Sequence, residues 1–237
     1  MSTNGYQPIV DSIAALPTDW HKAGSMSKST LLAIAARCTT IAPVRFSVET
    51  GSGKTTLLFS HASEEHKVFA KEDGNGSITQ VQKSELLNRD TVEFIDGATQ
   101  RALASYEFRC QIDIALIDGP HGYPFPDLDY FHLYPHIRTG GILLIDDIQI
   151  PTIQNMFQIL QADAMWASRG VVDNMAILER TAHPAVPPDG DHWWIQGYNL
   201  RPTGSAIRRL KWPIRMARRV VLKLKQAVRG SDGRNGG

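Results

Sequence analysis

Three aspartates directly follow apolar runs that are typical of buried strands. Asp118 comes after the run Ile112–Ile117, and Asp146 and Asp147 come after the run 142–145. Because neighbouring parallel strands end at the same edge of a sheet, we expect these carboxylates to lie close together. Like charges repel, and a hard divalent cation such as Mg²⁺ is a common reason to collect them. The alternative is that Asp146 or Asp147 only caps the next segment or turns the chain before Pro151.

A glycine-rich turn follows an earlier β-prone run, at residues 51–56 (GSGKTT). It contains the Gly-Lys-Thr of a phosphate-binding P-loop, but that loop needs a glycine five positions before its second glycine, where this chain has Val48. The alternative is a Glu49-x-Gly51-x-Gly53 turn, whose carboxylate suits a cationic, phosphate-free ligand such as S-adenosylmethionine. A plain tight turn before a helix is the third possibility.

The apolar pattern predicts an alternation of helices and strands. We expect strands at 44–48, 66–70, 92–95, 112–117 and 142–145, and helical segments at 29–37, 57–63, 84–88 and 99–106. Continuous apolar runs are typical of strands that are buried on both faces of a parallel sheet. The predicted fold is therefore a Rossmann-like, doubly wound and mostly parallel sheet with helices on both faces.

Four stretches together resemble one enzyme class, the class I S-adenosylmethionine-dependent methyltransferases. They are SVETGSGKTT, VEFIDGATQ, IDIALIDGPHGYPFPDLDY and GGILLIDD, and the resemblance extends over residues 44–180. Within the class, the chain is most similar to the metal-dependent O-methyltransferases related to catechol O-methyltransferase and to cephalosporin-hydroxylase-like proteins. In those enzymes the positions of Asp118, Asp146 and Asp147 bind Mg²⁺, which holds the acceptor hydroxyl.

The resemblance also implies roles for residues around the cofactor. Glu49, Gly51 and Gly53 would lie along its methionine and ribose parts, and Asp118 would lie nearby. Glu72, with Asp73 as its competitor, would hold the ribose hydroxyls. Thr99 and Gln100 would face the adenine. Two lysines depart from the family pattern, Lys54 inside the glycine turn and Lys71 before the acidic pair.

His121 lies three residues after Asp118, where the similar catechol enzymes carry the lysine that takes the acceptor proton. The resemblance therefore implies that His121 is the general base and that Asp118 acts beside it. An imidazole titrates near neutral pH, and a metal would lower the pKa of the hydroxyl toward that range. A loop histidine that is merely solvated or structural is the other interpretation.

The charges are unevenly distributed along the 237 residues. Residues 1–191 hold 14 Lys/Arg and 23 Asp/Glu, whereas residues 192–237 hold 11 Lys/Arg and 1 Asp/Glu. Nine of the basic residues lie between Arg208 and Arg229, where an apolar stripe with 3/4 spacing predicts an amphipathic helix. The segment 207–229 could contact an anionic membrane, pair with a partner, or dock on the acidic body. Nucleic-acid binding is not expected, because no motif that reads RNA or DNA accompanies the charge.

These observations predict a methyltransferase domain with an N-terminal helical segment at 1–182, a Pro/Trp-rich connector at 183–204 and a basic helical tail at 205–237. The expected function is a Mg²⁺-dependent O-methyltransferase that acts on a hydroxyl of a sugar, glycan or other small molecule. The alternative is a P-loop ATPase or kinase, and a binding module without activity comes third. With two cysteines, no signal peptide and no long apolar run, a cytoplasmic protein is expected. Peripheral contact with the inner face of the membrane and a homodimer are open alternatives.

Overall fold

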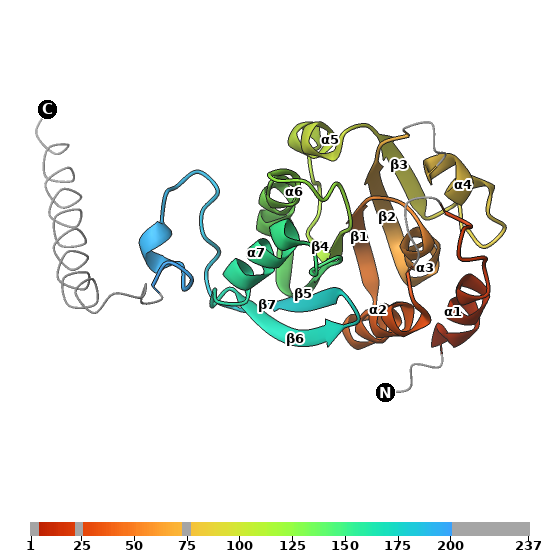
Figure 1. The fold of residues 1–237 in the computed structure, drawn as a ribbon, viewed down its shortest axis with the longest axis horizontal. Helices are drawn as coiled ribbons and strands as arrows, with labels where there is room; N and C mark the ends of the chain where they lie inside the picture. The colour runs from red at the N-terminus through yellow and green to blue at the C-terminus, as the bar shows by residue number, and fades with distance from the viewer. Residues whose placement is uncertain (1–4, 22–25, 73–76, 201–237) are drawn as a thin grey trace, which may run out of the picture. The chain divides into compact units, whose positions relative to one another are not determined.

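A computed structural model describes residues 5–21, 26–72 and 77–200. Its centre is a seven-stranded sheet with the order β3-β2-β1-β4-β5-β7-β6 (Figure 1). The strands are β1 (Val44–Thr50), β2 (Ser63–Ala70), β3 (Val92–Asp96), β4 (Ile112–Ile117), β5 (Ile137–Ile145), β6 (Trp166–Val172) and β7 (Met175–Arg180). The first five run parallel, and β7 pairs antiparallel with both β5 and β6. The predicted Rossmann-like, mostly parallel sheet is confirmed.

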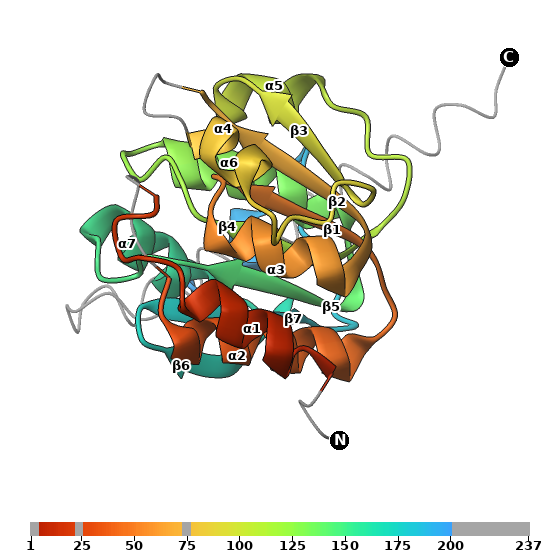
Figure 2. The same ribbon diagram turned by 90° about the vertical axis from the view of Figure 1, so that its right-hand side faces the viewer.

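Helices cover both faces of this sheet. They are α1 (Gln7–Ala14), α2 (Lys28–Ile41), α3 (Lys54–Ala62), α4 (Ser77–Lys83), α5 (Thr99–Ser105), α6 (Phe125–Leu133) and α7 (Pro151–Leu160). Apolar residues of α1, α2 and α3 pack in one core cluster with Ile114 and Leu144, and those three helices lie together in front of the sheet in Figure 2. Residues of α5, α6 and α7 pack in a second cluster with Ala115 and Ile145. Since alternate residues of β4 and β5 enter opposite clusters, both strands are buried on both faces, as their apolar runs predicted.

The register of the parallel strands brings three strand ends level. Thr50 of β1 pairs with Ile117 of β4, which pairs in turn with Ile145 of β5. The residues that follow these three strands, Gly51, Asp118 and Asp146, therefore leave the sheet at one edge. This is the edge at which open α/β sheets bind ligands.

One predicted element is wrong. The helical turn expected at 84–88 is a hydrogen-bonded turn, and the nearby helix α4 ends earlier, at Lys83. The Ser84 hydroxyl accepts the backbone N–H of Leu86, and the Arg89 guanidinium donates to the carbonyls of Gln82 and Ser84. These local bonds use groups that a continuing helix would need, because serine offers the backbone an alternative to helix bonding.

The chain divides into two compact units, Met1–Gly190 and one that begins at Asp191. The sheet and its helices belong to the first unit. In the described part of the second unit, a short 3₁₀ turn spans Trp193–Ile195. The predicted tail at 205–237 lies outside the described residues, and the predicted boundaries at 182 and 204 stay predictions. Within the described part of the chain, none of the helices is long and apolar enough to cross a membrane.

Candidate active site

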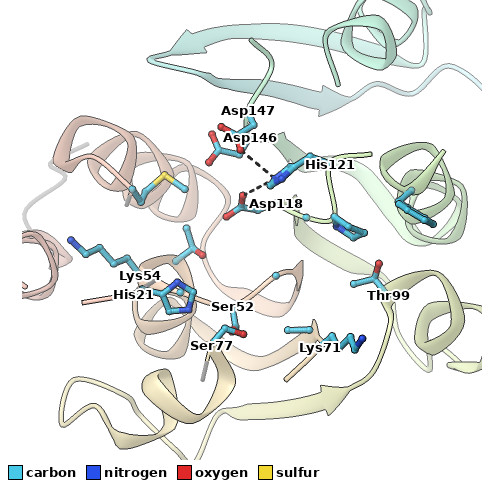
Figure 3. A pocket seen from close by; sticks show the side chains of 18 of the residues that line it. His21, Ser52, Lys54, Lys71, Ser77, Thr99, Asp118, His121, Asp146 and Asp147 are labelled. Carbon is cyan, nitrogen blue, oxygen red and sulfur yellow. Dashed lines mark ion pairs between the residues drawn. The ribbon is translucent and has the colours of Figure 1, made fainter. Parts of the chain in front are cut away.

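A cavity of about 680 Å³ opens at the carboxyl edge of the parallel strands (Figure 3). It is lined by eight residues that the sequence singled out: Gly51, Gly53, Thr99, Gln100, Asp118, His121, Asp146 and Asp147. They come from the ends of β1, β4 and β5, from the start of α5 and from the loop before α6. The structure therefore brings the predicted glycine turn, adenine-facing pair and carboxylate cluster to one place.

The glycine turn gives the cavity a close-fitting backbone wall. Gly51 has φ +88°, and a Cβ placed there would lie 2.4 Å from the carbonyl oxygen of Asp118. Its N–H donates to the carbonyl of Phe69 at 2.9 Å. The next glycine, Gly53, donates its N–H to Thr56 Oγ1 at 3.0 Å as α3 begins. Only glycine fits at Gly51, for two reasons. Its left-handed backbone conformation disfavours other residues, and a side chain there would clash with the backbone of Asp118.

Glu49 lies beneath the turn, away from the cavity. The side chain is 1% exposed, and Thr55 Oγ1 donates to its Oε2 at 2.7 Å. Thr56 Oγ1 donates to Oε1, and His66 Nε2 lies 3.2 Å from the same oxygen. The carboxylate thus ties the first turn of α3 to β1 and β2. Its direct contact with a cofactor, which the resemblance implied, stays a prediction, whereas its support of the turn is visible.

Glu72 and Asp73, the two candidates for holding the ribose, follow β2, and the structure describes only the first of them. Glu72 Oε2 accepts the backbone N–H and the hydroxyl of Thr79 at 2.9 and 3.0 Å, so this carboxylate supports α4. Asp73 lies outside the described residues. The neighbouring Lys71 lines the cavity wall, and Figure 3 shows its side chain extending away from Asp118 and His121. A ribose contact of Glu72 or Asp73 stays a prediction.

Gln100 presents a polar atom that the described chain leaves without a partner, because its Oε1 is buried with no hydrogen bond among the described residues. Thr99 is 4% exposed and begins α5, and its hydroxyl lies beside the Asp129 carboxyl, whose pKa it lowers. Buried polar atoms are normally paired, so atoms of this kind on a cavity wall indicate a ligand with polar groups.

At the other end of the cavity, an imidazole lies between carboxylates. His121 Nε2 is 3.2 Å from Asp147 Oδ2 and 3.9 Å from Asp118 Oδ1. Asp118, His121 and Asp147 each offer one ligand atom within 4.8 Å of the others. Asp147 has φ 56°, and Gln149 Nε2 donates to its Oδ1 at 2.7 Å. Asp146 also lines the cavity, directly after β5.

The carboxylates of this cluster repel one another and perturb the pKa values of their neighbours. Burial raises the pKa of Asp118 to about 7, although His121, 3.9 Å away, opposes the shift, and the charge of Asp146 raises it further. The Asp118 carboxylate in turn raises the pKa of His121, more than burial lowers it. Burial likewise raises the pKa of Asp146. A divalent cation would relieve this repulsion, so the donor set of carboxylate oxygens beside one imidazole fits a metal ion.

Several residues of the cavity carry no sequence signal of their own. His21 and Met26 reach it from the connection between α1 and α2, and Ser77 reaches it from the start of α4. Each is a single polar or apolar residue in an irregular segment, and only the folded path of the chain places it at the glycine turn. Ser52, inside the turn, is the one that its motif could have indicated.

Lys54, which follows the glycine turn, does not point at the centre of the cavity. It is 6% exposed, and its Nζ donates to the carbonyl of Leu16 at 3.4 Å. In Figure 3 its side chain extends away from the aspartates and His121. A P-loop lysine must instead reach the phosphates of its ligand.

The aromatic residues after His121 divide between two uses. Tyr123 is 78% exposed, and Phe125 lines the cavity. Tyr130 packs inward, where its hydroxyl accepts the indole N–H of Trp166 at 3.0 Å and its ring stacks on Tyr134. The first two are therefore available to an acceptor, whereas Tyr130 is part of the packing.

The residues present fit S-adenosylmethionine. The glycine turn allows close approach of the ligand, and the partnerless Gln100 Oε1 lies where the resemblance places the adenine. A carboxylate-rich end suits a cationic sulfonium. Among the described residues that line the cavity, Lys54 and Lys71 are the lysines and neither is directed at its centre, so a triphosphate finds no clamp.

Comparisons with known proteins agree with this geometry. Residues 48–148 match the family model described as a methyltransferase domain. A protein from Klebsiella pneumoniae that is assigned as an O-methyltransferase has a TM-score of 0.60 and 13% identity, over 74% of this chain and 91% of its own. An O-methyltransferase from Bacillus cereus in complex with SAH has a TM-score of 0.55 and 12% identity, over 74% of this chain and 90% of its own.

The O-methyltransferase TomG from Streptomyces achromogenes, solved with SAM, gives a TM-score of 0.55 and 13% identity, over 73% of this chain and 90% of its own. At such identities the likeness concerns the fold. No curated protein shows significant sequence similarity to the chain. The expected methyltransferase domain is confirmed by the match over residues 48–148, and the expected fold is confirmed by the solved structures.

Proposed function

We propose that this methyltransferase-domain protein transfers the methyl group of S-adenosylmethionine to a hydroxyl oxygen of a small molecule or glycan, with the help of Mg²⁺. One observation carries the proposal. A carboxylate cluster with a histidine forms one end of the cavity whose other wall is the glycine turn. A cofactor along that turn and an acceptor at the cluster would therefore lie side by side.

The transfer is a single displacement. The acceptor oxygen attacks the methyl carbon, the bond from that carbon to sulfur breaks, and S-adenosylhomocysteine leaves. The chain contributes mainly by holding the two reactants in line. Gly51 and Gly53 give the cofactor a backbone wall, and the polar atoms of Thr99 and Gln100 bind its adenine.

His121 takes the proton of the acceptor hydroxyl at Nε2 in this proposal. That atom is buried and has no hydrogen bond among the described residues that satisfies it, although Asp147 Oδ2 lies 3.2 Å away. Asp118, Asp146 and Asp147 would hold the metal ion, which when bound lowers the pKa of the hydroxyl that it coordinates. Asp118 and Asp147 also face His121, and their charges favour the imidazolium that proton transfer produces.

The acceptor class follows from the mouth of the cavity. Phe125 lines it, and the exposed ring of Tyr123 lies two residues after His121. Aromatic faces next to polar groups suit a sugar ring or an aryl ring. A hydroxyl of a glycan or of an aryl compound is therefore the proposed acceptor.

No observation favours the P-loop alternative. The position that a P-loop requires to be glycine is Val48, which is fully buried in β1, and the Lys54 ammonium is bound to Leu16. The ATPase or kinase function is not proposed further.

Metal binding tests the proposal without knowledge of the acceptor. Mn²⁺, used as a paramagnetic stand-in for Mg²⁺, should bind the wild-type protein in a titration followed by electron paramagnetic resonance. Asp118→Asn and Asp147→Asn should each weaken binding about tenfold or more, because each removes a charged ligand. Asp90→Asn, at an exposed aspartate outside the cavity, is the matched control. Equal Mn²⁺ affinity in all four proteins would contradict the proposed metal site.

A further inference from the structure

A fully buried acid lies behind the part of the cavity wall that Thr99 forms. Asp129, on α6, has no exposed surface, and it does not itself line the cavity. A carboxyl in such a place is costly unless groups that donate hydrogen bonds face it. The groups beside Asp129 therefore indicate what the acid does.

The hydroxyls of Thr50 and Thr99 are the donors beside this acid. Burial raises the pKa of Asp129, and each of the two hydroxyls opposes this rise, as a donor to a carboxylate does. Thr50 is fully buried at the end of β1, and its Oγ1 accepts the backbone N–H of Asp118 at 3.2 Å. Because that oxygen already accepts, the hydroxyl proton of Thr50 is free to point at Asp129. The acid thus joins the end of β1 to the start of α5.

The contact with Asp129 also determines how the Thr99 hydroxyl can act on a ligand. Thr99 is 4% exposed and lines the cavity (Figure 3). A hydroxyl has one proton and two lone pairs, so a proton that points at Asp129 leaves only the lone pairs for the cavity. The neighbouring Gln100 Oε1, which has no partner among the described residues, is a second acceptor on the same wall. A wall of acceptors suits a ligand group that donates hydrogen bonds.

We infer that Asp129 is a positioning residue, which turns the Thr99 hydroxyl so that the cavity accepts a hydrogen bond from the exocyclic amine of the cofactor's adenine. The inference rests on the proposed function, because it needs an adenine at this wall. Without the carboxyl, the Thr99 hydroxyl could rotate and donate instead. The site would then distinguish poorly between a purine that donates at this position and one that accepts. Such discrimination is strong where the wrong ligand leaves a buried polar group unpaired.

Two ligands that differ at this edge of the base test the inference. Calorimetry should compare S-adenosylhomocysteine with S-inosylhomocysteine, in which a carbonyl oxygen replaces the exocyclic amine. The wild-type protein should bind S-adenosylhomocysteine about tenfold or more tightly than the inosine compound. Asp129→Leu, which removes the carboxyl, and Thr99→Val, which removes the hydroxyl, should each lower this ratio several-fold. Asp129→Asn, which keeps one accepting oxygen, should give an intermediate ratio.

The double variant Asp129→Leu/Thr99→Val separates positioning from a general loss of structure. If Asp129 acts through Thr99, the double variant should have the same ratio as Thr99→Val alone, because the two effects do not add. A purely structural change would instead weaken both ligands equally and leave the ratio at its wild-type value. The matched control is Asp127→Leu, the same substitution on α6 at a residue that does not line the cavity, and it should keep the wild-type ratio.

A wild-type ratio in Asp129→Leu would overturn the inference, and so would single-variant effects on the ratio that add in the double variant or an equal fall in Asp127→Leu. If the leucine variant does not fold, a wild-type ratio in Asp129→Asn has the same meaning. Wild-type protein that binds both ligands equally would also overturn the inference and leave the proposed function intact. Failure of the wild-type protein to bind either ligand would overturn the proposed function, and the inference with it.

Discussion

Individual side chains give the cavity its chemistry, and His121 is the one on which proton transfer depends. The neighbouring Asp118 carboxylate raises its pKa most, and the charges of Asp147 and Asp146 act in the same direction. Only the neutral imidazole can accept a proton, so in the metal-free protein His121 becomes a base above the ordinary histidine range of about 6.5. A bound cation would oppose the imidazolium and move the titration back toward lower pH.

A titration of His121 by nuclear magnetic resonance checks that its pKa is raised in the metal-free protein. In the metal-free protein its pKa should lie above about 6.5, and Asp118→Asn should lower it because the largest stabilising contact is lost. The Asp118→Asn protein should still bind S-adenosylhomocysteine. A wild-type pKa at or below the ordinary histidine value of about 6.5 would contradict the proposed pairing.

Asp129 of α6 is a second residue whose charge state has a measurable effect. It is fully buried, and burial raises its pKa to about 7, although the hydroxyls of Thr99 and Thr50 oppose the shift. The folded state therefore prefers the neutral acid, whereas the unfolded chain ionises near 3.8. Stability contributed by this residue is complete below the unfolded pKa and is lost as pH rises through about 7.

Asp129→Asn removes this loss because the amide does not ionise. Relative to wild type, the variant should gain roughly 1–4 kcal/mol in free energy of unfolding between about pH 4.5 and about pH 8. Urea denaturation at the two pH values measures the difference. A stability difference that is the same at both would show that Asp129 is ionised in the folded protein at low pH.

At the scale of elements, the strand ends carry the site, and the sequence predicted most of them. The runs at 112–117 and 142–145 located β4 and the end of β5, because strands buried on both faces are continuously apolar. The antiparallel strands β6 and β7 were not predicted. Most residues of β6 are exposed or half-buried, and its sequence lacks an apolar run. β7 begins with a buried apolar run, but a run of four residues does not distinguish a strand from part of a buried helix. Tertiary contacts rather than local pattern define that edge of the sheet.

The residues of the candidate site likewise divide into those that the sequence could predict and those that it could not. Residues next to strand ends, such as Asp118 and Asp147, could be predicted because the sheet places them. His21 and Ser77 could not, because they belong to irregular connections whose paths depend on the packing of α1, α2 and α4. Glu49 shows a third case: its position at the turn was predicted, but the threonines that hold it beneath the turn became visible only in the structure.

The turn between β1 and α3 should be intolerant of a side chain at Gly51. In Gly51→Ala the new Cβ would meet the Asp118 carbonyl, and φ +88° disfavours alanine. We expect a loss of about 2–4 kcal/mol in free energy of unfolding, with S-adenosylhomocysteine affinity reduced about tenfold or more. Gly5→Ala is the control, because a Cβ there meets nothing within 4 Å. Equal behaviour of the two variants in thermal melts and calorimetry would contradict the described turn.

For the whole molecule, cofactor binding and the basic tail should be separable. Every residue of the cavity lies in the unit Met1–Gly190. We propose that the segment 207–229 contacts anionic membrane surfaces, since each Lys or Arg near such a surface adds about 1 kcal/mol. The chain truncated after Gly204 should bind S-adenosylhomocysteine like the full chain and should lose sedimentation with phosphatidylglycerol vesicles. Vesicle binding by the truncated chain would exclude the tail as the membrane element.

The central claim, that the cavity binds an S-adenosyl cofactor and not a nucleoside triphosphate, is tested most directly by calorimetry of the full chain. S-adenosylhomocysteine and ATP with Mg²⁺ should be titrated under the same conditions into the wild-type protein and Lys54→Ala. We predict that S-adenosylhomocysteine binds the wild-type protein and that ATP does not. Tight ATP binding that Lys54→Ala abolishes would contradict the account.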